Sequence, residues 1–151
     1  MPIGYTTHPT GLMDRLYRWI SQVSSRYAGG ADKVATQEAK HGHLRAQRLA
    51  YDCVQHVGRQ LRVGMTEIEA AQLLADYLRD HGTERYLHRP FAWFGEHSRF
   101  DAYKTYGDYH PSERRLRQDD VVILDISPVV DGYVADIGYT LSLAPNAEMD
   151  R

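Results

Sequence analysis

The sequence predicts an α/β protein of the α+β type, in which two helices are followed by antiparallel strands. Apolar residues recur at helical spacing through the first half of the 151 residues, and β-rich runs flank an Asp-Gly pair in the second half. The 42% hydrophobic content is ordinary for a globular chain of this length. We therefore expect one main domain with a single core.

An N-terminal extension over residues 1–30 precedes that domain. Its first residues are rich in Pro, Gly and Thr, and Leu12, Leu16 and Trp19 then follow the spacing of a short amphipathic helix. Gly29-Gly30 separates this helix from the rest of the chain. We expect residues 31–151 to form the main domain.

A long helix is predicted from about Lys33 to Leu61, with Gly64 ending it. Its small apolar residues recur every three or four positions and form one buried face: Ala46, Ala50, Cys53, Val54, Val57 and Leu61.

A second helix is predicted over residues 66–81. Thr66 and Glu69 have the spacing of a capping box, in which each side chain accepts from the other residue's backbone N–H. Gly82 supplies the C-terminal stop. The expected buried face consists of Ile68, Ala71, Leu74, Ala75 and Leu78.

The strands begin with the extended segment "YLHRPFAWFG" and continue, after a polar stretch, in "VVILDISPVVDGYVADIGYTLSL". Asp131-Gly132 between two β-rich runs predicts a two-residue hairpin turn. Val130 then pairs with Tyr133, and Asp125 lies opposite Gly138.

In this register Asp125 and Asp136 project from the same face as diagonal neighbours, roughly 5 to 8 Å apart at Cβ. A bulge at Pro128 would reverse that parity. Two interpretations follow for the two aspartates. They are either solvent-facing residues of an edge hairpin or ligands of divalent ions such as manganese, cobalt, iron or zinc.

The segment "LRQDDVVILDISPVVDGYVADIGYTLSL" resembles the first metal-ligand hairpin of the pita-bread metallopeptidases, the family of methionine aminopeptidase, Xaa-Pro aminopeptidase, prolidase and creatinase. "VGMTEIEAAQLLADYL" also looks like part of the paired helices of that family. The resemblance spans about residues 33–145. It implies the first half of a pita-bread fold, with helices on the outer side of a curved antiparallel sheet that cradles two divalent metal ions.

The resemblance implies five protein ligands, of which this chain shows Asp125 and Asp136. A histidine and two glutamates belong to the second half of the fold, so we expect the domain to be truncated at its C-terminus. The resemblance also implies a histidine that holds the substrate or the oxyanion. His88 and His110 are the candidates, and we favour His110, fifteen residues before Asp125.

The resulting hypothesis is a dinuclear-metal aminopeptidase of the Xaa-Pro or methionine aminopeptidase type. It would act on the N-terminus of a peptide substrate, with three of five ligands absent from this chain. With two carboxylates alone, we expect weak metal binding and no peptidase activity. The alternative is a non-catalytic binding module or an inactive fragment.

Charge and composition exclude other classes. The 18 basic and 20 acidic residues are interspersed, so the chain lacks the basic face that nucleic acid binding requires. It has no run of eighteen apolar residues and no signal-peptide pattern, and Cys53 is its single cysteine, so we expect a cytoplasmic protein without a membrane segment. A homodimer stays open, although both copies would bring the same two aspartates.

Overall fold

The computed structural model describes residues 36–99 and 103–144, so the extension predicted over residues 1–30 lies outside them. The chain divides into two units, Met1–Gln37 and Glu38–Arg151, and the elements below belong to the second unit apart from the first residue of α3. Among the described residues, no helix is both long and apolar enough to cross a membrane.

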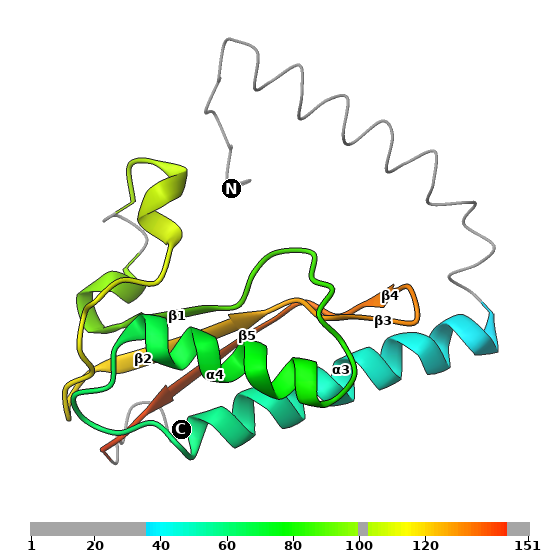
Figure 1. Ribbon diagram of the computed structural model, residues 1–151, viewed down its shortest axis with the longest axis horizontal. Coiled ribbons are helices and arrows are strands. Elements are labelled where there is room, and N and C mark those ends of the chain that lie inside the picture. Colours follow the sequence, from blue (N-terminus) through cyan, green and yellow to red (C-terminus); the bar gives the residue numbers. More distant parts are fainter. Residues whose placement is uncertain (1–35, 100–102, 145–151) are drawn as a thin grey trace, which may run out of the picture. The chain divides into compact units, whose positions relative to one another are not determined.

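The order of elements is helix, helix, strands, which confirms the predicted α+β class (Figure 1). Three antiparallel strands form one sheet in the order β1-β2-β5, and β3 pairs with β4 in a two-stranded extension of the hairpin. Two 3₁₀ helices, η1 and η3, lie between β1 and β2. The bounds are α3 Gln37–Gly58, α4 Glu67–Asp80, β1 Phe91–Phe94, η1 Gly95–Ser98, η3 Tyr106–Tyr109, β2 Val121–Ile126, β3 Val129–Val130, β4 Tyr133–Val134 and β5 Ile137–Ser142.

Helix α3 has the buried face that the sequence predicts but a different end. The six predicted positions are all buried, and Leu61 reaches the core from the turn after the helix. The helix ends at Gly58 rather than near Leu61, because glycine is a poor helix former and the chain turns immediately after it. Gly64 serves the next turn instead, with φ +90°.

Helix α4 begins and ends as predicted. The Thr66 N–H donates to Glu69 Oε2 at 2.8 Å, and the Glu69 N–H donates to Thr66 Oγ1 at 3.1 Å, so the capping box is complete. His81 is the C-cap, and Gly82 follows it with φ +91°, the left-handed conformation that favours glycine.

The buried face of α4 is rotated from the predicted one. Ile68 is 45% exposed, and Ala71 and Ala75 are only partly buried, whereas Glu67 and Ala70 lie in the interior with Leu74 and Leu78. The prediction for Ile68 was wrong because a glutamate takes the interior position beside it. A carboxylate can lie there only if protein donors replace its water.

Four donors surround the Glu67 carboxylate. The Phe94 N–H donates to Oε1 at 2.8 Å, and the N–H and hydroxyl of Ser112 donate to Oε2 at 2.9 and 2.7 Å. His97 Nδ1 lies 2.7 Å from Oε2, and its Nε2 lies 2.8 Å from the backbone oxygen of Asp108. Glu67 therefore ties α4 to β1, η1 and the loop before β2.

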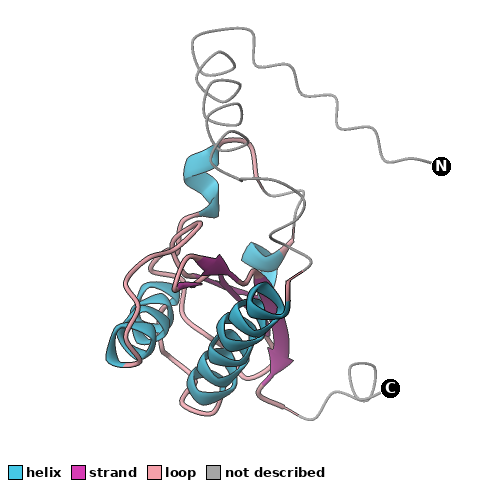
Figure 2. Ribbon diagram, turned by 90° about the vertical axis from the view of Figure 1, so that its right-hand side faces the viewer, coloured by secondary structure: helices cyan, strands magenta, loops and turns pink. Residues whose placement is uncertain are grey.

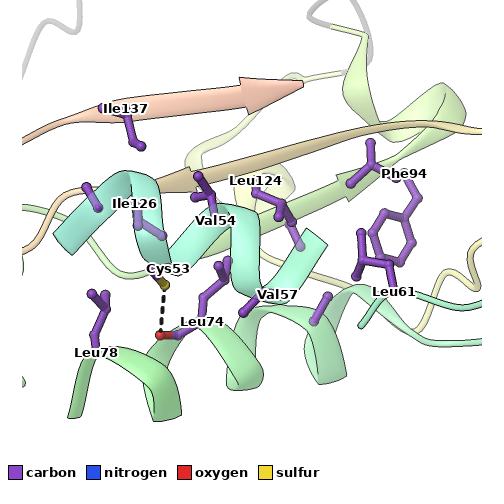
Figure 3. Packing of buried hydrophobic residues seen from close by; sticks show 14 of the residues in the cluster. Cys53, Val54, Val57, Leu61, Leu74, Leu78, Phe94, Leu124, Ile126 and Ile137 are labelled. Carbon is purple, nitrogen blue, oxygen red and sulfur yellow. Dashed lines mark hydrogen bonds between the residues drawn. The ribbon is translucent and has the colours of Figure 1, made fainter. Parts of the chain in front are cut away.

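The sheet buries one face against both helices. Along the central strand β2, Val122, Leu124 and Ile126 are buried, while the alternate residues are only partly buried. Figure 2 shows α3 and α4 on the same side of the strands, and Figure 3 shows Leu124, Ile126 and Ile137 pointing from the strands toward these helices. In the core between the sheet and the helices, Cys53 Sγ lies 3.6 Å from the backbone oxygen of Leu74. Burial raises the pKa of the Cys53 thiol to about 12. The other face of β2 carries Asp125.

Candidate metal centre

The hairpin has the register that the sequence predicts. Asp125 pairs with Gly138 and Val130 with Tyr133, and the two ladders on either side of Pro128 keep the same register. No bulge reverses the parity, because the Pro128 carbonyl accepts from the Ala135 N–H at 3.1 Å across the gap between the ladders. The predicted hairpin is therefore confirmed.

The turn at Asp131-Gly132 has φ +51° and +84°, both positive. Two consecutive left-handed residues define the type I′ turn, whose twist matches that of the flanking strands. Asp131 thus serves the turn, and Asp125 and Asp136 are the other two carboxylates of this hairpin.

Asp125 and Asp136 face the same side of the hairpin, away from the helices, and His88 lies between them. His88 Nε2 is 3.6 Å from Asp125 Oδ1 and 3.2 Å from Asp136 Oδ1. One ligand atom of each of the three residues lies within 4.8 Å of the others, and this is the one group of three such residues in the described part of the chain.

The three side chains differ in exposure. His88 and Asp125 are about one quarter exposed, at 24% and 25%, whereas Asp136 is 57% exposed. Burial raises the pKa of Asp125, the neighbouring His88 opposes the rise, and the Asp136 carboxylate adds to it. Ionised Asp125 is therefore under-compensated in the protein, and a cation beside it would be favourable.

His88 reaches the hairpin because the chain between α4 and β1 runs alongside residues 127–129. The Leu87 N–H donates to the Ser127 backbone oxygen, and the Val129 N–H donates to the Arg85 backbone oxygen. The fully buried Ser127 hydroxyl accepts from the His88 N–H at 2.8 Å and donates to the His88 carbonyl at 3.1 Å. Ser127 thus holds both polar groups of the His88 backbone.

His110 takes a different position. Its ring lies 6.1 Å from that of Phe91, and Phe91 stacks on His88 with the centroids 5.3 Å apart. His88, His110 and Phe91 line one open cavity of about 380 Å³. Of the two candidate histidines, the structure brings His88 to the carboxylates and places the ring of His110 beside Phe91.

The sequence did not indicate that Ser127 helps to position His88. The predicted register already placed Ser127 opposite Asp136, but nothing in the sequence indicates that the segment before β1 runs past it. Pairing between residues so distant along the chain leaves no local pattern.

The donor set fits a divalent ion. An imidazole nitrogen with carboxylate oxygens suits zinc, cobalt, iron or manganese, and the two carboxylates would balance the charge of one such ion. Within the described residues, His88 is the only hydrogen-bond or ion-pair partner of either carboxylate, so their other lone pairs stay free for a ligand.

Comparison with known proteins identifies the family of this chain. The model of metallopeptidase family M24 matches residues 41–151, which include most of α3, all of α4, the sheet and the three-residue cluster. No protein with a curated description matches the chain.

Several solved structures share the fold. An X-Pro aminopeptidase from Thermotoga maritima MSB8 matches with a TM-score of 0.63 and 22% identity, over 76% of this chain and 31% of its own. A prolidase from Pyrococcus furiosus matches with 0.61 and 21%, over 70% and 31%, and a dipeptidase from Pyrococcus horikoshii OT3 with 0.62 and 25%, over 76% and 30%. The chain thus spans about a third of the length of these proteins, and the match confirms the predicted fold.

Proposed function

Because this chain belongs to metallopeptidase family M24, we propose that it contributes the two-aspartate hairpin of a metal-dependent aminopeptidase centre. Asp125 and Asp136 would be metal ligands, and the substrate would be the N-terminal end of a peptide. The single observation that carries the proposal is the convergence of Asp125, Asp136 and His88 on the side of the hairpin that the helices leave open.

The finer assignment follows the similar structures. Their names are those of an X-Pro aminopeptidase, a prolidase and a dipeptidase, so we propose an Xaa-Pro or related N-terminal bond as the target. When bound, divalent ions supply Lewis acidity and make water more acidic. The complete site would take two of them, from among manganese, cobalt, iron and zinc.

The residues of this chain divide the remaining work. The carboxylates of Asp125 and Asp136 would bind the metal cations at the open face of the hairpin. His110 lines the same cavity as His88, so we assign it to the substrate or to the oxyanion that forms during attack. Phe91 packs against both histidine rings and supplies an apolar wall to the cavity.

A direct experiment compares peptidase activity of this chain with that of a form that includes any coding sequence continuing its reading frame. Both are assayed on an Xaa-Pro peptide with manganese or cobalt. We expect no turnover by residues 1–151 alone and turnover by the extended form. Asp125→Asn with Asp136→Asn should abolish that turnover.

The control is Asp131→Asn, which removes one carboxylate charge from the same hairpin. Asn-Gly is as suitable as Asp-Gly for a type I′ turn, so the fold and the activity should both be kept. Activity that survives the double substitution at residues 125 and 136 would refute the proposed ligands.

A further inference from the structure

We propose that His88 is a metal ligand through Nε2, so that His88, Asp125 and Asp136 form a site for one divalent ion within this chain. The inference rests on the proposed metal role of the two aspartates. It adds a nitrogen donor that lies outside the two-aspartate hairpin, and it predicts tighter binding than two carboxylates alone would give.

The orientation of the His88 ring supports the assignment. Nδ1 lies 2.8 Å from the backbone oxygen of Arg89. A carbonyl oxygen only accepts hydrogen bonds, so Nδ1 carries the hydrogen in this contact and Nε2 faces Asp125 and Asp136. Histidines that bind metals characteristically donate their second ring N–H to a carbonyl or carboxylate in this way.

The two carboxylates of the cluster favour binding of a cation. Neutral His88 with its hydrogen on Nδ1 would direct the Nε2 lone pair at carboxylate oxygens 3.2 and 3.6 Å away. A proton on Nε2 would offset one of the two negative charges, whereas a divalent ion would offset both and would accept all three lone pairs. The divalent ion is therefore the better complement of this set.

The distances are compatible with a shared ion. Ligands at about 2.0 to 2.2 Å from a metal lie roughly 3 to 4 Å from one another. The two distances from His88 fall in this range, and the three ligand atoms all lie within 4.8 Å. Small rotations of the more exposed Asp136 side chain would close the set.

Contacts with neighbouring residues fix the position of His88 before any ion binds. The buried Ser127 hydroxyl fixes the His88 backbone, and the Phe91 ring stacks on the imidazole with an interplanar angle of 15°. A ligand whose position is fixed before binding loses little conformational entropy when the ion arrives. Imidazole with carboxylate favours zinc or cobalt over magnesium, which prefers oxygen ligands alone.

The first test is calorimetry of the whole 151-residue chain with Zn²⁺. The wild type should bind one ion, and His88→Gln should weaken binding by at least about tenfold, since even groups that only support a ligand are worth 10- to 100-fold. Asp125→Asn with Asp136→Asn should abolish binding. His56→Gln, which removes an exposed histidine of α3, should change nothing. Thermal unfolding of each variant in chelator checks that it is folded.

The second test needs no substitution. Correlation spectra of the histidine rings of ¹⁵N-labelled protein should show the His88 Nε2 resonance moving on addition of Zn²⁺ while Nδ1 keeps its hydrogen. An unchanged His88 resonance at saturating Zn²⁺ would overturn the inference.

The outcomes separate this inference from the proposed function. If the double aspartate variant loses binding but His88→Gln does not, His88 is no ligand and the two aspartates keep their proposed role. If the double aspartate variant still binds Zn²⁺ like the wild type, the inference and the proposed ligands both fail.

Discussion

Two carboxylate–histidine sites occur in this domain, and they are built in opposite ways. Glu67 is fully buried and meets four donors, including His97. Asp125 and Asp136 are partly exposed, and within the described residues they share His88 as their one partner. The first site has one carboxylate and many donors, whereas the second has two carboxylates and one ring.

The difference separates a structural site from the proposed ligand site. A buried carboxylate whose lone pairs are all satisfied has nothing left to offer, and its value lies in the segments that it joins. Carboxylates with free lone pairs, excess negative charge and an open side are arranged to receive a cation. Both sites contain a histidine, so the presence of a histidine does not make this distinction, but the number of donors around each carboxylate does.

The comparison is tested most strongly at Glu67. Glu67→Ala would leave the N–H groups of Phe94 and Ser112 and the ring of His97 without their acceptor, so we expect a loss of about 3 to 5 kcal/mol in the free energy of unfolding. Urea unfolding measures it, with the exposed Glu113→Ala as control. A loss below about 1 kcal/mol would show that the Glu67 site is not structural.

Ser127→Ala should have the next largest effect. Removal of the buried hydroxyl leaves the His88 N–H and carbonyl without their partner, which costs about 1 to 3 kcal/mol. Urea unfolding in the presence of chelator measures the change. Wild-type stability in this variant would mean that His88 is not held by Ser127, contrary to the preorganised site described above.

Thr66→Ala should cost about 0.5 to 2 kcal/mol by removing the N-cap of α4. The backbone hydrogen bond from Thr66 is the largest cause of the lowered pKa of Glu69. A lowered pKa means that the folded state favours the ionised carboxylate, so the contribution of the capping box is present above the unfolded pKa of Glu69 and is lost as the pH falls through its folded pKa. Reversible unfolding at several pH values measures both effects, and a cost below about 0.3 kcal/mol would mean that the box does not contribute.

Asp125→Asn should be the mildest change and should have the opposite sign. Folding raises the pKa of Asp125, chiefly through burial, so its ionisation costs stability above the folded pKa, and the cost disappears as the pH falls through that value. In chelator, the variant should therefore unfold at a slightly higher temperature than the wild type at neutral pH. A clear destabilisation would place Asp125 with Glu67 as a structural acid.

Local patterns predicted the frame of the candidate site. The Asp131-Gly132 turn needs two residues that tolerate positive φ, and the period of two along the strands then placed Asp125 and Asp136 on one face. The capping box at Thr66 is likewise a short-range signal, and it formed as predicted.

The features that sequence patterns missed all depend on contacts between distant segments. Nothing in the local sequence distinguishes Glu67 from an exposed acid in the first turn of a helix. It is an interior residue because Phe94 of β1 and Ser112 donate hydrogen bonds to its carboxylate. Spacing along the chain likewise gives no sign that the segment carrying His88 pairs with residues 127–129 and so brings His88 to the carboxylates. That pairing joins residues about forty positions apart, beyond the reach of any periodic signal.

The two aspartates differ in how firmly strand pairing holds their backbones. Asp125 lies on the central strand and is paired on both sides, with Phe91 and Gly138. Asp136 lies in the short stretch between the β2–β5 and β3–β4 ladders, outside any strand. In the proposed metal site, Asp125 would keep a fixed position and Asp136 would adjust, so that ions of different radius could be accepted by moving Asp136 while strand β2 stays still.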